Sequence, residues 1–207
     1  MTRIYAIAAA AVIVTLTAVL WVVSRDGSDD QFAQCRASAI AGGSDQIGGS
    51  FTLVDEAGAT VTDAEVIDEP ALIYFGYTYC PDICPMDVAR NVETVTLLED
   101  RGYSVKPVFI TIDPERDTPE QLAEFTDYLH PRMVGLTGSA EQIKAASKAY
   151  RTYYNAHKSG EDDEFYLVDH STFSYLTLPE SGFVEFFRRD QPSDQIADSI
   201  ACFLDAA

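Results

Sequence analysis

Basic side chains are scarce in this chain of 207 residues. It has 14 lysines and arginines against 33 aspartates and glutamates, which gives a formal net charge of -19. No cluster of basic residues interrupts this acidity, so the chain would repel nucleic acid, and nucleic-acid binding is excluded as a function. Internal repeats and low-complexity tracts are also lacking, and the length suggests one domain with additional segments.

Charge is absent altogether from the N-terminal stretch Ile4–Val23, which is rich in Ala, Val, Leu and Ile. A helix of this length would cover the roughly 30 Å apolar core of a bilayer. We therefore predict a single membrane anchor at 1–24, with its N-terminus in the cytoplasm. The alternative is a cleaved signal peptide, but its apolar region would be only about 7–15 residues long. Either segment sends the remainder across a membrane, into a compartment that tolerates disulfides.

Polar, Gly- and Ser-rich sequence follows, and we predict a tether at 25–46 that leads into a domain at 47–207. The order of strand-like and helix-like segments in this domain predicts a three-layer α/β sandwich with an N-terminal β-hairpin. The segments are a hairpin at 51–61, a strand at 71–76, a turn at 77–85, a helix at 86–99, a strand at 105–112, helices that start near Thr118 and Ser139, strands at 165–168, 173–178 and 183–187, and a helix at 193–204.

Cys80 and Cys84 lie where a buried strand is followed by a helix. The amide groups and the dipole at a helix N-terminus stabilise negative charge, so a thiol there tends to ionise to the thiolate that binds metals and attacks disulfides. Three residues separate the two cysteines, whereas a thioredoxin-type redox site has two. The pair could share a metal ion or form a disulfide. A static disulfide would close a very short loop and stabilise the fold little.

A metal bound by two thiolates usually needs a third ligand, and the chain has only three histidines. His130 precedes a proline at a predicted helix end, and we expect it at the surface. His157 is also expected to be exposed. His170 lies between two strand-like runs, where an α/β fold often places functional groups. Spacing alone leaves open whether His170 is a ligand or a structural histidine.

Three sequence blocks carry a resemblance to a known family. The segments 75–85, which contains both cysteines, 111–119 and 166–171, which contains the histidine, resemble the three signature blocks of the SCO/SenC family of cytochrome oxidase assembly factors. The blocks occur in the family's order, and the resemblance extends from about residue 47 to 203. An N-terminal anchor is also usual in this family.

This resemblance implies a thioredoxin-like fold that binds one copper ion per chain, Cu(I) or Cu(II), through Cys80, Cys84 and His170. It implies a metallochaperone rather than an enzyme, which delivers copper to the dinuclear centre of cytochrome c oxidase subunit II. An upstream copper donor and a thiol reductant would be further partners. The protein would be a single-pass inner-membrane protein, with its soluble domain on the periplasmic or mitochondrial intermembrane-space side.

Two enzymatic alternatives compete with the metallochaperone. The first is a thiol-disulfide oxidoreductase that reduces the copper-site cysteines of subunit II, with Cys80 and Cys84 as its redox-active pair. Such an enzyme would not need His170, so this residue separates the two functions. The second is a peroxidase of the peroxiredoxin type, which is disfavoured because Thr78 stands two residues before Cys80 rather than three.

The remaining cysteines, Cys35 and Cys202, lie at opposite edges of the predicted domain. Domain termini are often close together, so we expect a structural disulfide between them. The alternative is two unpaired cysteines, with Cys202 buried as a small apolar residue of its helix.

Three acidic residues within the first two of these blocks are candidates for a functional role. We expect Asp113 and Asp117 to cap turns and to pair with Arg116. For Asp82 two interpretations stay open: it tunes the pKa of the thiols or contacts a partner, or it is a charge at a helix start. None of them is assigned to the site.

Overall fold

The computed structural model describes residues 2–25, 30–37, 46–160 and 163–207. The chain divides into two compact units, one of residues 1–34 with Ala207 and one of residues 35–206. Much of the tether that the sequence predicts at 25–46 lies outside the described residues.

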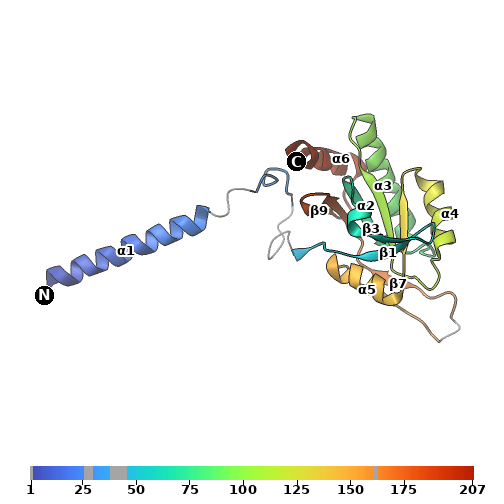
Figure 1. Ribbon diagram of the computed structural model, residues 1–207, viewed down its shortest axis with the longest axis horizontal. Helices are drawn as coiled ribbons and strands as arrows, with labels where there is room; N and C mark the ends of the chain where they lie inside the picture. Colours follow the sequence, from blue (N-terminus) through green and yellow to red (C-terminus); the bar gives the residue numbers. More distant parts are fainter. Residues whose placement is uncertain (1, 26–29, 38–45, 161–162) are drawn as a thin grey trace. The chain divides into compact units, whose positions relative to one another are not determined.

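The first unit contains one long helix, α1 (Thr2–Arg25), drawn in blue in Figure 1. Two of its threonines donate their hydroxyl hydrogens back to the helix, as from Thr15 Oγ1 to the carbonyl oxygen of Ala11 at 2.6 Å. Over the part of the chain that the structure describes, no helix combines the length and the apolar character needed to cross a membrane.

The second unit is built on a seven-stranded mixed sheet with the strand order β2-β1-β5-β4-β3-β8-β9. Strands β3, β4 and β5 run parallel, and the outer pairs are antiparallel. Its elements are β1 (Thr52–Asp55), β2 (Thr60–Thr62), α2 (Asp63–Val66), β3 (Ala71–Gly76), α3 (Ile83–Asp100), β4 (Lys106–Thr111), α4 (Pro119–Leu129), β5 (Val134–Thr137), α5 (Ala140–Ala149), β6 (Tyr154–Ala156), β7 (Val168–His170), β8 (Ser174–Leu178), β9 (Gly182–Phe187) and α6 (Ser193–Ala206).

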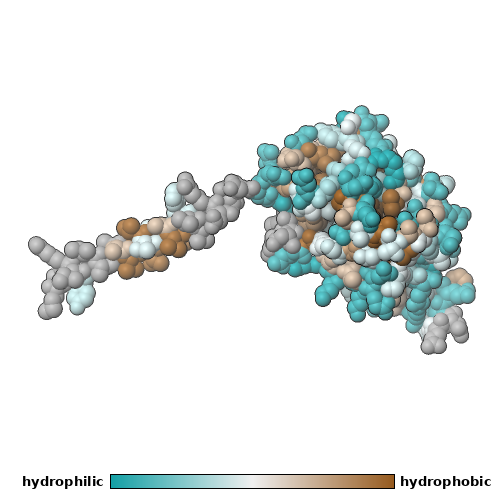
Figure 2. Space-filling view, in the orientation of Figure 1, coloured by the Kyte–Doolittle hydropathy of each residue, from teal (hydrophilic) through white to brown (hydrophobic). Residues whose placement is uncertain are grey.

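Helices cover both faces of this sheet, because successive side chains of the buried strands point to opposite sides. Phe109 of β4 packs against Phe125 of α4, with ring centroids 5.0 Å apart. Phe75 of β3 instead contacts Tyr150, which ends α5, at 5.4 Å. Helices α3 and α6 lie side by side (Figure 1). Hydrophilic side chains dominate the visible face of this unit (Figure 2), so the apolar residues form an interior core.

Strand β5 is a central parallel strand that the sequence analysis did not predict. It has only four residues, and its second residue is Gly135, which lowers strand propensity. A Cβ atom at this position would lie 2.7 Å from Glu56 Oε1 and 3.0 Å from Leu122 Cβ. Close packing of α4 on the sheet therefore requires glycine at this position. The same glycine weakens the strand signal in the sequence.

The strand predicted at 165–168 is wrong for most of its length. The structure has a strand only from Val168 to His170, and it pairs with β6 in a separate two-stranded sheet. In this apolar run Tyr166 is buried and donates its hydroxyl hydrogen to Asp113, whereas Phe165 and Leu167 are exposed.

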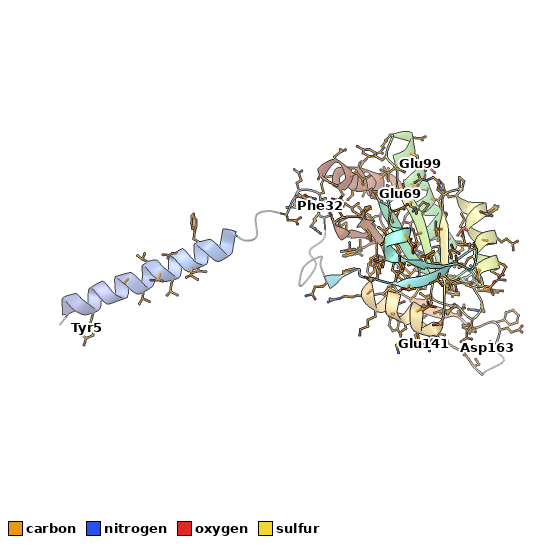
Figure 3. All side chains as sticks on the ribbon, in the orientation of Figure 1. Tyr5, Phe32, Glu69, Glu99, Glu141 and Asp163 are labelled. Carbon is orange, nitrogen blue, oxygen red and sulfur yellow. A yellow bond between two sulfur atoms is a disulfide. The ribbon has the colours of Figure 1, made fainter. Side chains whose placement is uncertain are left out.

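His130 is buried, which corrects the prediction that it lies at the surface. Its Nδ1 accepts a hydrogen bond from the backbone N–H of Arg132 at 3.2 Å. The guanidinium of Arg132 bridges Glu69 and Glu99 at 2.7 and 2.8 Å, and Figure 3 labels these two carboxylates near the end of α3. His130 thus belongs to a structural polar network at this end of the sheet.

A disulfide joins Cys35 to Cys202, the pair that the sequence analysis favoured, with Cα atoms 5.7 Å apart. The residues that follow Cys35 are held on β9. Arg36 Nη1 donates to the carbonyl oxygen of Val184 at 2.6 Å, and the N–H of Ala37 donates to Glu185 Oε2 at 3.1 Å. The start of this unit is therefore fastened to both β9 and α6.

We expect the double substitution Cys35→Ser/Cys202→Ser to lower the free energy of unfolding by about 2–5 kcal/mol, because it frees a loop of more than 160 residues in the unfolded chain. Urea unfolding of the full chain measures this difference. The matched control is Cys80→Ser/Cys84→Ser, which removes two thiols and keeps the disulfide. An unchanged midpoint for the first variant would contradict the structural role of the bond.

Candidate metal centre

The two cysteines are positioned by the connection between β3 and α3. Strand β3 ends at Gly76, and α3 begins at Ile83, three residues earlier than the sequence predicts. Cys80 therefore lies in the loop and Cys84 in the first helical turn. The backbone N–H of Cys84 donates to Cys80 Sγ at 3.3 Å, and both side chains are buried and unoxidised. The N–H of Cys84 is thus one of the amide groups at the helix start that favour a thiolate at Cys80.

His170 reaches the same place from β7. Its Nε2 lies 3.2 Å from Cys84 Sγ, and its Nδ1 lies 2.8 Å from the carbonyl oxygen of Ser171. A carbonyl can only accept, so the proton belongs on Nδ1 and the lone pair of Nε2 faces the sulfur. The rings of Tyr74 and Tyr77 meet the imidazole edge-on, with centroids 6.1 and 6.0 Å away. The imidazole is thus held in one orientation.

One ligand atom from each of Cys80, Cys84 and His170 lies within 4.8 Å of the other two. The structure brings together all three residues that the resemblance implies as ligands. Thiolates select soft metals such as Cu(I), and imidazole suits copper as well as zinc. The donor set and its spacing fit a single soft metal ion.

The two thiols differ in acidity. The hydrogen bond from the Cys84 thiol, together with the backbone N–H groups of Cys84 and Asp82, lowers the pKa of Cys80 and outweighs the opposing effect of burial. The same pairing with Cys80, together with burial, raises the pKa of Cys84. At neutral pH the pair of thiols therefore carries one negative charge and shares one proton.

Gly76 permits the close approach of the Cys84 sulfur to the sheet. A Cβ atom on Gly76 would lie 3.2 Å from Cys84 Sγ, 2.7 Å from Tyr74 Cε1 and 3.0 Å from Phe109 Cε2. Any larger residue would push the sulfur or the rings aside. Sequence reasoning treated this glycine only as the end of a strand.

Asp117 holds the cysteine loop, a role that sequence reasoning missed. Asp113 pairs with Arg116 at 2.6 Å as expected, but Asp117 instead accepts hydrogen bonds from the N–H and hydroxyl of Thr78, at 3.1 and 2.6 Å, and from Thr111 Oγ1 at 2.5 Å. Burial raises the pKa of Asp117. Because Thr78 stands two residues before Cys80, this carboxylate ties the start of the loop to β4.

Two other candidates lie apart from the centre. His157 is exposed, as expected, and contacts Asp169 Oδ2 at 2.7 Å. Asp82 is exposed at the N-cap position of α3, and its side chain makes no capping hydrogen bond. Neither is brought within the cluster of ligand atoms.

Comparison with known proteins identifies the chain's relatives. A family model described as SCO1/SenC matches residues 40–205. The chain belongs to the SCO1/SenC family. It is similar to Protein SenC of Rhodobacter capsulatus, with 52% identity over 201 residues that cover 97% of this chain and 89% of that protein. It is also similar to the mitochondrial SCO1 homolog 1 of Arabidopsis thaliana, with 42% identity over 155 residues, which cover 74% of this chain and 46% of that protein.

Two solved structures of the family resemble this one. Arabidopsis thaliana ScoI with copper bound is 40% identical, has a TM-score of 0.73, and covers 78% of this chain and 99% of its own. Yeast Sco1 with copper bound is 36% identical, has a TM-score of 0.74, and covers 78% of this chain and 90% of its own. The thioredoxin-like α/β fold and the family expected from the three sequence blocks are confirmed.

In the reduced, metal-free SCO1/SenC chain we expect one thiolate at pH 6, about 2.5 units below the ordinary pKa of a cysteine thiol. Cys80 should reprotonate only as the pH falls further, and Cys84 should stay protonated above the pH at which a free thiol ionises. Replacing Cys84 by Ala removes the main donor to Cys80 and should raise its pKa, whereas Ser keeps a donor and should raise it less. The thiolate pKa of the unmodified chain, Cys84→Ala and Cys84→Ser is measured from the ultraviolet absorbance of the thiolate as a function of pH. An unchanged pKa of Cys80 in the Cys84→Ala variant would contradict this account.

Proposed function

We propose that this protein is a copper metallochaperone that binds one copper ion through Cys80, Cys84 and His170. The observation that carries the proposal is the convergence of these three donors within 4.8 Å. It is supported by the two similar structures determined with copper bound. The lowered pKa of Cys80 also supports it, since metal binding requires deprotonated thiols and the pair then has only one proton left to release.

We propose further that the copper is delivered to the dinuclear centre of cytochrome c oxidase subunit II. The resemblance of the three sequence blocks supports this acceptor. A hollow of about 390 Å³ supports an exchange of ligands, because it opens beside the donors and is lined in part by Cys80, Ile83, Leu167 and His170. An acceptor thiolate could enter there and replace the chain's ligands one at a time. An upstream copper donor and a thiol reductant would complete the cycle, because only the reduced pair binds the metal.

A thiol-disulfide oxidoreductase acting on the cysteines of subunit II is the second candidate. The acidic Cys80 beside a protonated Cys84 favours it, because a thiolate attacks a disulfide and a neighbouring thiol resolves the mixed disulfide. In that reaction Cys80 and Cys84 would form a disulfide, and the acceptor disulfide would take up the two electrons. The short contact of His170 with Cys84 favours the copper carrier, since a dithiol reductase does not need it.

We also propose that residues 1–24 anchor the protein in the inner membrane, with the second unit on the periplasmic or intermembrane-space side. The uncharged run Ile4–Val23 supports an anchor, and the disulfide between Cys35 and Cys202 supports an oxidising compartment.

Titration of the reduced full chain with Cu(I) against a competing chelator should give one copper per chain. Cys80→Ser and Cys84→Ser should abolish binding. His170→Ala should weaken it by more than about 100-fold, because even the partners that orient a ligand are worth about 10–100-fold in affinity. His157→Ala is the matched control, and its exposed imidazole should be dispensable. Full affinity of the His170→Ala chain would contradict the three-ligand centre and favour the oxidoreductase.

Membrane fractionation tests the anchor. The full chain should stay with the membranes after a wash at high salt, which removes proteins held only by charge. A mature protein that starts near Arg25 and is recovered free of membranes would contradict the anchor and favour a cleaved signal peptide.

A further inference from the structure

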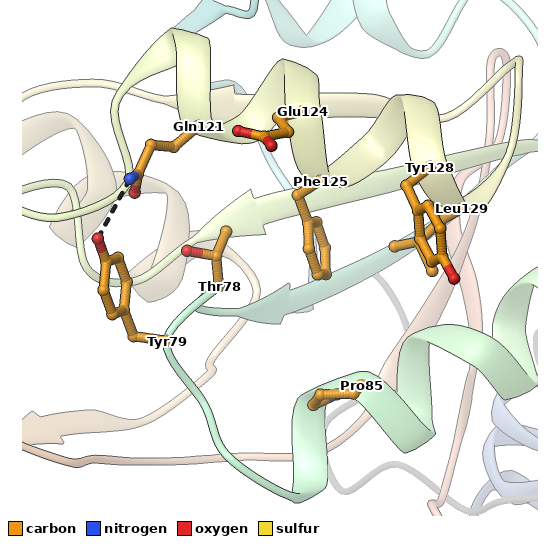
Figure 4. A pocket seen from close by; sticks show the side chains of 8 residues that line it. All are labelled: Thr78, Tyr79, Pro85, Gln121, Glu124, Phe125, Tyr128 and Leu129. Carbon is orange, nitrogen blue, oxygen red and sulfur yellow. Dashed lines mark hydrogen bonds between the residues drawn. The ribbon is translucent and has the colours of Figure 1, made fainter.

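An apolar groove runs beside the cysteine loop, between the start of α3 and the helix α4 (Figure 4). Its volume is about 490 Å³, and most of its exposed lining is aromatic or aliphatic. The residues that line it are Thr78, Tyr79, Pro85, Gln121, Glu124, Phe125, Tyr128 and Leu129. Exposed apolar patches of this kind on a soluble, acidic surface mark sites of interaction.

The walls of this groove are held in place by polar and cation–π contacts, and one of these, between Thr78 and Asp117, also holds the cysteine loop. Gln121 Nε2 donates to the Tyr79 hydroxyl at 3.1 Å, drawn as the dashed line in Figure 4, so the tyrosine is tied to α4. The Arg116 guanidinium lies 4.9 Å from the centre of the same ring. Thr78 is held by the buried carboxylate of Asp117. The groove is therefore largely formed before any partner arrives, which reduces the entropic cost of binding.

Two residues that line the groove are chain neighbours of the cysteine ligands. Tyr79 directly precedes Cys80, and Pro85 directly follows Cys84, and consecutive Cα atoms are only about 3.8 Å apart. A protein that receives copper must bring its own ligand atoms against the sulfur of Cys80. The residues that flank those ligands then have to lie over the neighbouring surface, and on this side that surface is the groove.

The charge along α4 indicates the chemistry of the partner. This helix carries Glu120, Glu124 and Asp127 and no Lys or Arg. Glu124 lines the groove itself. Tyr128, one turn further on, is 90% exposed. An apolar side chain seated in the groove would thus lie beside the carboxylate of Glu124, which favours a Lys or Arg next to that side chain.

We propose that this groove binds an extended segment of the copper acceptor, with an aromatic or aliphatic side chain seated against Phe125 and Tyr128 and a basic residue opposite Glu124. The inference rests on the proposed function, because it assigns the occupant to the protein that takes the metal. Docking here would place the acceptor's ligands next to Cys80. The groove would determine which protein receives the copper, whereas Cys80, Cys84 and His170 bind the copper itself.

The test measures the dissociation constant between the copper-loaded full chain and the copper-free soluble domain of cytochrome c oxidase subunit II by calorimetry. Tyr128→Ser should raise this constant about tenfold or more, as truncation of a central aromatic contact does at other interfaces. Phe165→Ser is its matched control, because this aromatic side chain is also 90% exposed but does not line the groove. Glu124→Lys should weaken binding as well, whereas Glu180→Lys, on the β8–β9 turn, should not. All four variants should still bind one copper.

Absence of binding by the unmodified chain, or an unchanged dissociation constant for Tyr128→Ser, would overturn the proposal. So would self-association of the chain that Tyr128→Ser abolishes, since a second copy would then occupy the groove. Binding that depends on Tyr128 and Glu124 but is not followed by copper transfer would uphold the groove and contradict copper delivery. Docking in the groove and delivery of copper to subunit II can therefore be contradicted independently.

Discussion

The contact between Cys84 Sγ and His170 Nε2, at 3.2 Å, joins two segments that are 86 residues apart in the chain. Several elements of the fold position the two residues of this contact. The helix α3 carries the sulfur, Gly76 leaves space for it against the sheet, and β7 delivers the imidazole in the tautomer set by Ser171. A soft metal ion needs these donors only a few ångströms apart, so the fold acts here mainly by fixing distances.

The local part of this arrangement could be predicted from sequence. A buried strand followed by a helix start explains why Cys80 and Cys84 face one another and why one thiol ionises easily. His170 could not be found in this way, because no local pattern reports on contacts across 86 residues, and it was identified through the resemblance of the block around it. The disulfide of Cys35 with Cys202 followed from the proximity of domain ends.

The sequence analysis missed the strand β5 and predicted a strand at 165–168 that is mostly absent. In both cases tertiary packing determines which residue stands at a key position. Gly135 weakens the signal of β5 and at the same time lets α4 pack on it. The apolar run around Tyr166 looks like a strand, but it buries this tyrosine against Asp113 and Arg116 and leaves its neighbours exposed. The role of Asp117 could not be predicted for another reason, since its two hydrogen bonds to Thr78 join residues 39 positions apart in the chain.

The central claim is that two sulfurs and one imidazole nitrogen hold the copper. X-ray absorption at the copper edge of the Cu(I)-loaded full chain counts these donors directly. The account predicts two sulfur ligands and one nitrogen ligand, with the nitrogen lost when His170 is replaced by Ala. A spectrum with sulfur ligands alone in the unmodified chain would contradict it, because the geometry around His170 would then have no part in binding the metal.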